Sequence, residues 1–149
     1  MRPEKLWWMS VQLHRGNHRI LAKLVKLINY WLFSAVLPYE CDIDPTVSIL
    51  HRGLCVVVHP NTTIGRHVSI GHGVTLAAGS NEPGSPYRII VEDDVIIGSH
   101  SMVICRAHEE LRLGRGCVVG GGSIVTRSVG PGEIVAGPPA RVIGIRSTN

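Results

Sequence analysis

The sequence predicts a mainly β protein, a parallel β-helix of six-residue repeats with a short helical segment at its N-terminus. The first observation is that an aliphatic residue returns every six positions through most of the chain after residue 42. The second is that glycine often follows that residue, where a chain turning a tight corner leaves little room for a side chain. The third is a composition with 44% hydrophobic but only 5% aromatic residues, and with 17 glycines. Such a core is built from Val and Ile at many small, repeated positions.

The chain has one organisational boundary, near residue 38. Its 149 residues have room for one domain and a short appendage. Most of the aromatic residues precede Pro38, and the six-residue period begins after it. We therefore expect an N-terminal helical cap over residues 1–40 and a β-helix domain over residues 41–149.

Two helices are expected in the cap. The stretch from Pro3 to Leu13 favours a short helix, and residues 18–37 favour a second one that Pro38 ends, because the residue before a proline is disfavoured in the α region. Lys23 and Lys26 interrupt the apolar run near its middle, which argues against a membrane-spanning helix. Two roles remain open for this segment. It can pack on the main domain or a neighbouring subunit, or it can rest on the inner face of the membrane as an interfacial helix.

The repeat indicates a triangular coil, because a period of six fits neither an α-helix nor a simple alternating strand. Each hexapeptide supplies one short flat strand and one corner, and stacked coils pair strand to strand. The first residue of each hexapeptide is expected to point into the prism. These inward positions are Ile43, Val58, Ile64, Ile70, Leu76, Val91, Ile97, Val103, Leu113, Val119 and Val125.

Two segments interrupt the repeat. Residues 77–89 are rich in Gly, Pro and Ser and are expected to loop out of the prism. Residues 104–112 exceed one hexapeptide by four and predict a second, charged protrusion. Loops carried on a rigid scaffold are where such a protein would hold its chemistry.

Charge and cysteine content narrow the class of ligand. A net charge of +4 suits an anionic ligand such as coenzyme A, whereas the scattered Lys and Arg without interleaved aromatics argue against nucleic acid. The four cysteines form neither a CxxC motif nor a zinc spacing, and no histidine pair has a metal spacing, so no metal site is expected. With no signal peptide visible, the expected location is the cytoplasm.

The sequence resembles the serine acetyltransferase branch of the hexapeptide-repeat acyltransferases, and most closely its short members found with polysaccharide biosynthesis. The likeness covers about residues 42–144 and rests on the segments DIDPTVSI, HRGLCVVVHPNTTIG, DDVIIGSHSMV, VVGGGSIV and AGPPARVIG. It implies a left-handed β-helix and a homotrimer with an active site in each groove between neighbouring prisms. It also implies acetyl-CoA as co-substrate and a histidine that takes the proton from an acceptor hydroxyl.

The resemblance points to two candidate catalytic histidines. His51 lies in the motif where the family keeps its catalytic histidine, but the interval from His51 to Ile64 is one residue longer than in serine acetyltransferases. Strict counting would place Arg52 there, and an arginine stays charged and cannot act as a base. A one-residue bulge at Arg52-Gly53 would restore His51, which we favour. His72 is the alternative, because it occupies the third position of its hexapeptide, as His51 does.

The same resemblance suggests the binding residues. For coenzyme A these are Ala78, Gly79, Gly98, Ser99, Gly121, Gly122, Ala140 and Arg141. For the acceptor they are Arg52, Tyr87 and Arg88. Leu50 stands where serine acetyltransferases have an aspartate, and Tyr87-Arg88 stand where they have a second histidine. The groups that would hold an amino acid are therefore missing.

These departures favour a sugar or glycan hydroxyl in polysaccharide biosynthesis as the acceptor. Two alternatives stay open. The chain could be a serine O-acetyltransferase of cysteine biosynthesis, or a structural β-helix trimer without catalytic activity.

Overall fold

The computed structural model describes residues 2–79, 88–106 and 109–146. Two helices, α1 (Pro3–Arg15) and α2 (Arg19–Phe33), precede a stack of short strands. The strands are β1 (Asp42–Ile43), β2 (Ser48–Ile49), β3 (Val57–Val58), β4 (Thr62–Ile64), β5 (Ser69–Ile70), β6 (Thr75–Ala78), β7 (Arg88–Val91), β8 (Ile96–Ile97), β9 (Met102–Cys105), β10 (Glu110–Leu113), β11 (Val118–Val119), β12 (Ile124–Val125), β13 (Glu133–Ala136) and β14 (Arg141–Ile145). A short 3₁₀ segment, Leu50–Gly53, lies between β2 and β3.

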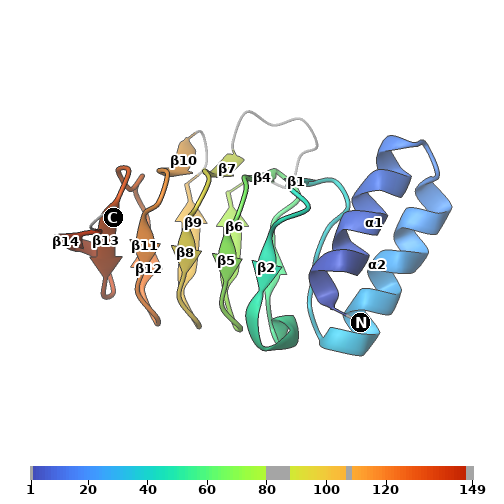
Figure 1. The fold of residues 1–149 in the computed structure, drawn as a ribbon, viewed down its shortest axis with the longest axis horizontal. Coiled ribbons are helices and arrows are strands. Elements are labelled where there is room, and N and C mark those ends of the chain that lie inside the picture. The colour runs from blue at the N-terminus through green and yellow to red at the C-terminus, as the bar shows by residue number, and fades with distance from the viewer. Residues whose placement is uncertain (1, 80–87, 107–108, 147–149) are drawn as a thin grey trace.

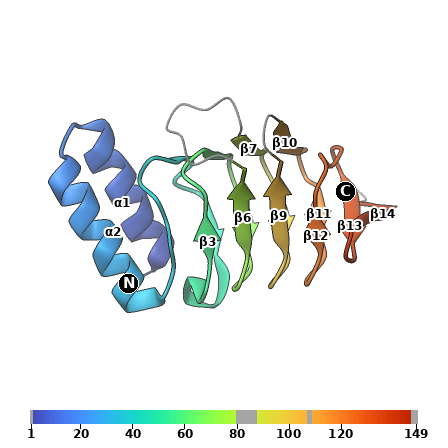
Figure 2. The ribbon, with the colours of Figure 1, turned by 180° about the vertical axis from the view of Figure 1, so that it is seen from behind.

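The strands form three sheets that face one another as the sides of a prism. Every third strand is a neighbour as far as β12, and β13 and β14 extend the second sheet; the orders are β1-β4-β7-β10, β2-β5-β8-β11-β13-β14 and β3-β6-β9-β12. All pairings are parallel except that of the terminal strand β14 with β13. Followed from the helical end, the chain passes from the sheet of β1 to those of β2 and β3 in a left-handed sense (Figures 1 and 2). The predicted fold class is confirmed.

The core of the prism consists of stacked aliphatic residues, one per strand. The residues at the first positions of the hexapeptides are all buried, and each pairs in register with its equivalent in the next coil, as Ile70 does with Ile97 and Val119 with Val135. Deep burial of many branched side chains compensates for the shortness of the individual strands. The six-residue period therefore identified the core correctly.

Both loops are shorter than the sequence indicated. Residues 77 and 78 complete β6 and residues 88 and 89 begin β7, so the first interruption contains 79–87, of which only Gly79 is described. Ile104 and Cys105 end β9, and β10 begins at Glu110, so the second interruption spans 106–109. In both places the chain continues pairing with the adjacent coil, because ladder hydrogen bonds satisfy backbone groups that a loop would leave unpaired.

The second helix ends earlier than predicted, at Phe33 rather than at Pro38. Ser34 takes a left-handed conformation and donates its backbone N–H to the Tyr30 carbonyl, which closes the helix. The chain then extends, and Val36 forms a parallel bridge with Val57. Strand pairing with the first coil thus begins before the boundary that the composition suggested.

The two helices lie against the first coil, with α1 between the prism and α2 (Figures 1 and 2). Trp7 is fully buried and donates its indole N–H to the Pro38 carbonyl at 2.7 Å. Asn29 donates from its side-chain amide to the Pro3 carbonyl at 3.0 Å, which ties α2 to α1. Within the described ranges, neither helix is long and apolar enough to cross a membrane.

Candidate active site

One edge of the prism gathers several of the predicted site residues. Four corner segments stack there between the sheet of β2 and the sheet of β3, and we call this edge the histidine corner: residues 50–56, 71–74, 98–101 and 120–123. The first segment has seven residues and the next has four, so the first coil carries three additional residues at this edge. Those extra residues contain His51.

The backbone at the long corner has an unusual conformation. His51, Arg52 and Gly53 are all left-handed, with φ of 50°, 61° and 70°. Only glycine adopts such angles without cost, so two side-chain-bearing residues in succession imply that packing holds the segment. A Cβ on Gly53 would lie 3.1 Å from the Ile49 side chain and 3.3 Å from that of Pro3, so helix α1 packs closely against this turn. The corner is irregular at Arg52-Gly53, where the sequence suggested a bulge.

Three histidines form a row along the histidine corner. The ring centroids of His51 and His72 are 4.9 Å apart, and those of His72 and His100 are 4.6 Å apart, both edge to face. His72 is half-buried, and its Nδ1 lies 3.0 Å from the Ser99 hydroxyl. Ser99 therefore fixes the orientation of the central imidazole. The structure brings together both candidate catalytic histidines.

His100 is the member of the row that the sequence interpretation passed over. Its backbone N–H donates to the His72 carbonyl at 2.9 Å, in the ladder between adjacent coils. Because the strand register pairs Ile70 with Ile97, His100 lies opposite Gly73, one position after His72. Counting coil by coil from that pairing would have placed His100 at the same corner.

A shallow pocket of about 210 Å³ opens beside His51. It is lined by Leu32, Phe33, Ser34, His51, Arg52 and Leu54. The Arg52 guanidinium lies over the Phe33 ring, 5.4 Å from its centroid, so this predicted acceptor-binding residue contacts helix α2. An exposed imidazole next to an open pocket can reach a hydroxyl group, which is the geometry that a general base requires.

The residues predicted to bind coenzyme A divide into three places. Gly98, Ser99, Gly121 and Gly122 all lie at the histidine corner. Gly121 and Gly122 are exposed, so the backbone there is open to a ligand. A Cβ on Gly98 would collide with the backbone of the next coil, so that glycine is required by the stacking itself.

The other predicted coenzyme residues lie elsewhere. Ala78 ends β6 and Gly79 follows it, so both are at a different edge of the prism. Ala140 donates its backbone N–H to the Ile124 carbonyl, next to β12, and Arg141 begins β14. A pocket of about 230 Å³ is lined there by residues that include Arg127 and Arg141, two cations suited to phosphate.

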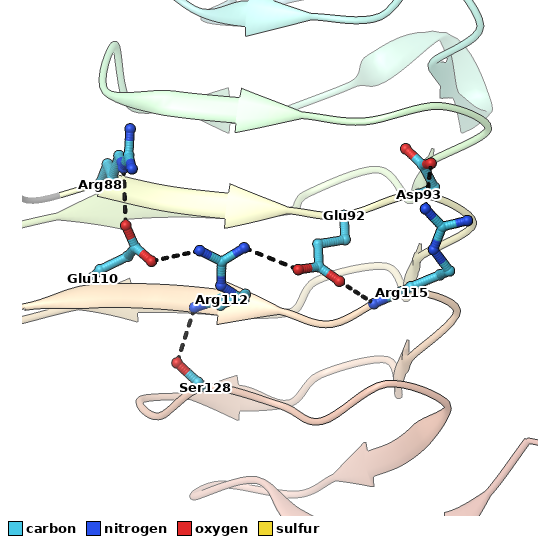
Figure 3. Close-up of polar contacts among 7 residues, drawn as sticks. All are labelled: Arg88, Glu92, Asp93, Glu110, Arg112, Arg115 and Ser128. Atoms are coloured by element: carbon cyan, nitrogen blue, oxygen red, sulfur yellow. Dashed lines mark hydrogen bonds and ion pairs between the residues drawn. The ribbon is translucent and has the colours of Figure 1, made fainter.

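Of the predicted acceptor residues at the first loop, Arg88 does not join the histidines within one chain. Tyr87 lies outside the described residues. Arg88 belongs to the sheet of β1, which we call the charged face, where its Nε donates to the Glu110 carboxylate at 2.9 Å (Figure 3). Glu110 in turn accepts from Arg112, which also donates to Glu92.

Ion pairs and burial shift the pKa values of several side chains. The arginines on the charged face lower the pKa values of Glu92 and Glu110, mainly through hydrogen bonds from Arg112 and Arg88 respectively. Burial raises the pKa of Cys117 to about 11, which makes it an apolar filler rather than a nucleophile. Within residues 2–79, 88–106 and 109–146, no three His, Cys, Asp or Glu side chains are placed to hold a metal ion.

Comparison with known proteins yields relatives of two kinds, and no protein-family model matches. The chain is 44% identical over 81 residues to a 2,3,4,5-tetrahydropyridine-2,6-dicarboxylate N-acetyltransferase of Staphylococcus aureus, which is 54% of this chain and 32% of that protein. The chain thus spans about a third of the length of such curated relatives.

Solved structures of serine acetyltransferases share the fold. The Brucella abortus enzyme matches with a TM-score of 0.84 at 22% identity, over 97% of this chain and 56% of its own. The soybean enzyme complexed with serine matches with a TM-score of 0.81 at 28% identity, over 93% and 54%. A Brucella abortus serine acetyltransferase in complex with coenzyme A also matches, with a TM-score of 0.81 at 20% identity over 97% and 56%.

Proposed function

We propose that the chain is a hexapeptide-repeat acyltransferase and that it transfers an acetyl group from acetyl-CoA to a hydroxyl of a sugar or glycan precursor. The observation that carries the proposal is the contact of His51 with His72 beside the open pocket at the histidine corner. A neutral imidazole can accept a proton at neutral pH, so a hydroxyl placed there would become a nucleophile.

His51 is the proposed base. It is exposed and lines the pocket, whereas His72 is half-buried and hydrogen bonded to Ser99. We assign His72 the role of a positioning residue that packs against the His51 ring. The acceptor oxygen attacks the thioester carbonyl and its proton passes to His51. The C–S bond then breaks, and the His51 imidazolium returns the proton to the leaving sulfur, which releases coenzyme A as a thiol.

Acetyl-CoA is proposed to lie along the histidine corner. The backbone at Gly121 and Gly122 is exposed and carries no side chain, so the pantetheine arm could approach it closely, although the Gly122 N–H already donates to the Ser99 carbonyl. Arg141 and Arg127 offer positive charge for the phosphates. Whether Ala78 and Gly79 contribute depends on a neighbouring subunit, because they occupy a different edge of the prism.

The acceptor is proposed to be a glycan hydroxyl because the residues at the pocket lack a group for an ammonium ion. The pocket has apolar walls from Leu32 and Leu54, and its charged group is a guanidinium, Arg52. A carboxylate that would attract the amino group of serine is not among the residues that line it. A sugar hydroxyl needs hydrogen bonds but no opposite charge.

A comparison of acceptors tests this proposal. Release of thiol from acetyl-CoA is measured with a nucleotide sugar, a glycan fragment, L-serine and a small amine as acceptors. Because Cys55 is an exposed thiol that would react with the detecting reagent, the assay uses Cys55→Ser protein. We expect kcat/KM for a sugar acceptor to exceed that for L-serine by at least ~10-fold, which corresponds to about 1.4 kcal/mol of transition-state binding. Efficient turnover of L-serine would instead support a serine O-acetyltransferase, and no thiol release with any acceptor would support a structural trimer.

A further inference from the structure

We propose that helix α2 is a membrane-binding surface that holds the protein on an anionic lipid bilayer. The inference goes beyond acetyl transfer and does not depend on it. It rests on an unpartnered apolar face, on the distribution of charge along the chain, and on the position of α2 at one end of the molecule.

The outward side of α2 is unusually apolar. The helix packs on α1 through a narrow face that includes Ala22, Val25 and Asn29, and it turns its larger aliphatic residues away from the protein. Ile20 and Trp31 are 83% and 76% exposed. The helix stripe, as we call the exposed set, consists of Ile20, Leu21, Leu24, Leu27, Ile28, Trp31 and Leu32. Contiguous apolar surface of this kind marks a binding site rather than a solvated face.

Spacing places these residues on one side of the helix. Ile20, Leu24, Leu27 and Trp31 follow one another at intervals of three and four, so they form a single strip along the axis. Lys23 lies on the flank of that strip, where a long side chain can keep its ammonium at a polar boundary while its stem covers apolar surface.

The distribution of charge along the chain favours an anionic lipid as the partner of α2. Residues 1–39 contain six Lys or Arg and one acidic residue, a net charge of +5, whereas residues 40–149 contain nine and ten, a net charge of −1. The excess positive charge of the whole chain therefore resides in its helical segment. Anionic lipid head groups attract such a segment, and the apolar strip then enters the boundary between head groups and acyl chains.

A hollow beside the helix stripe is also suited to an anionic lipid. It has a volume of about 520 Å³ and is lined by Lys23, Lys26, Leu27, Tyr30, Ala35, Val36 and Tyr39. Lys26 lies 5.3 Å from the centroid of the Tyr39 ring, so its ammonium is held at the rim. Two ammonium groups above apolar walls suit a lipid phosphate above an acyl chain.

The helix stripe also borders the candidate active site. Leu32 belongs to the helix stripe and lines the pocket beside His51, and Leu54, which also lines that pocket, is 53% exposed. A bilayer in contact with α2 would therefore lie next to the histidine corner. A second copy of the chain is a poorer occupant, because two segments of net charge +5 would repel each other.

Vesicle binding tests the proposal directly. The purified protein is centrifuged with vesicles of phosphatidylcholine alone and of phosphatidylcholine mixed with phosphatidylglycerol, without acetyl-CoA. We expect at least ~10-fold more protein bound to the anionic vesicles, with the difference falling as salt is added. Trp31→Glu should reduce binding by at least ~10-fold, because it removes an interfacial aromatic and adds a negative charge.

Two matched controls separate the stripe from general surface effects. Ile143→Glu makes the same kind of change at an exposed residue of β14, at the opposite end of the molecule, and Arg106→Gln removes an exposed cation of the β-helix. Both should bind vesicles like the wild type, whereas Lys23→Gln should bind less. Equal binding of Trp31→Glu and wild type would overturn the proposal. So would a lower mass of Trp31→Glu in light scattering without lipid, since the stripe would then be a contact between copies.

Discussion

The histidine row packs against a glycine. Gly73 has φ of +68°, and a Cβ there would overlap the His100 ring. The imidazole of His100 occupies the space that the missing side chain leaves. Both the backbone conformation and the contact therefore favour glycine at this corner.

We predict that Gly73→Ala destabilises the protein more than Gly116→Ala does. Gly116 has the same φ of +68° but no heavy atom within 4 Å of an added Cβ, so it reports the conformational cost alone. That cost is about 1–2 kcal/mol, and Gly73→Ala adds the displacement of His100. Urea unfolding of the two variants measures the difference. Equal losses of stability would show that the His100 ring is not packed against Gly73.

At the scale of the elements, ion pairs on the charged face connect adjacent coils of the prism. Ion pairs link Arg88, Glu110, Arg112 and Glu92 across adjacent coils, and Asp93 pairs with Arg115 beside them (Figure 3). Arg66 pairs with the same Asp93 carboxylate. Arg88, Glu110 and Arg112 belong to β7 and β10, and the other four residues lie in the turns that follow β4, β7 and β10. Exposed pairs of this type contribute little individually, commonly less than about 1 kcal/mol.

The contribution of Glu110 should depend on pH. Its pKa is lowered in the folded protein by Arg88 and Arg112, so its stabilising effect is present above the unfolded pKa and is lost as the pH falls through the folded pKa. We expect Glu110→Gln to lower the urea midpoint at pH 7 but to match the wild type near pH 3. Glu109→Gln, at an exposed neighbour whose carboxylate has no arginine partner among the described residues, should have no effect at either pH. A pH-independent effect of Glu110→Gln would mean that its packing, not its charge, matters.

The end of α2 shows where sequence rules fell short at the scale of an element. Pro38 correctly indicated that no helix continues past it. The last helical residue, however, is Phe33, four residues before the predicted end at Leu37. The deciding interaction is the pairing of Val36 with Val57, a partner 21 residues away in sequence. A local signal can bound a helix, but competition from a distant strand determines its last turn.

At the scale of the whole molecule, the sheet of β3, β6, β9 and β12 presents apolar side chains outward, whereas the charged face presents ion pairs. Its outward residues Val36, Val57 and Met102 are 37–39% exposed and apolar. This apolar face borders the histidine corner, so a neighbouring prism packed on it would also close the groove beside His51 and His72. Such packing would place the pocket beside His51 at a contact between copies of the chain.

We therefore predict a trimer in solution, with three times the chain mass of 16.2 kDa in light scattering. Met102→Glu, placed on the apolar face, should reduce the mass to that of one chain, while Arg112→Glu on the charged face should leave it unchanged. A monomer at micromolar concentration in the wild type would exclude both the trimer and a site completed by a neighbouring subunit.

The sequence predicted the core better than the site, for a physical reason. A repeating aliphatic residue such as Ile70 or Ile97 is buried by the same rule in every coil, so the period is sufficient to find it. A corner residue is positioned by how many residues its own turn contains, and the first turn has three more than the next. The contact of His51 with His72 could therefore not be predicted from the sequence and is seen only in the structure. The same holds for the position of Arg52 against the Phe33 ring.

The most direct test of the account is acetyl transfer by the wild type and by the two histidine variants, measured as thiol release together with formation of acetylated acceptor. If His51 takes the acceptor proton, His51→Ala should lower kcat by ~10²–10⁴ while the KM for acetyl-CoA changes little, and His72→Ala should lower kcat less. Full activity of His51→Ala, or a greater loss in His72→Ala, would contradict the assignment of the base at this corner.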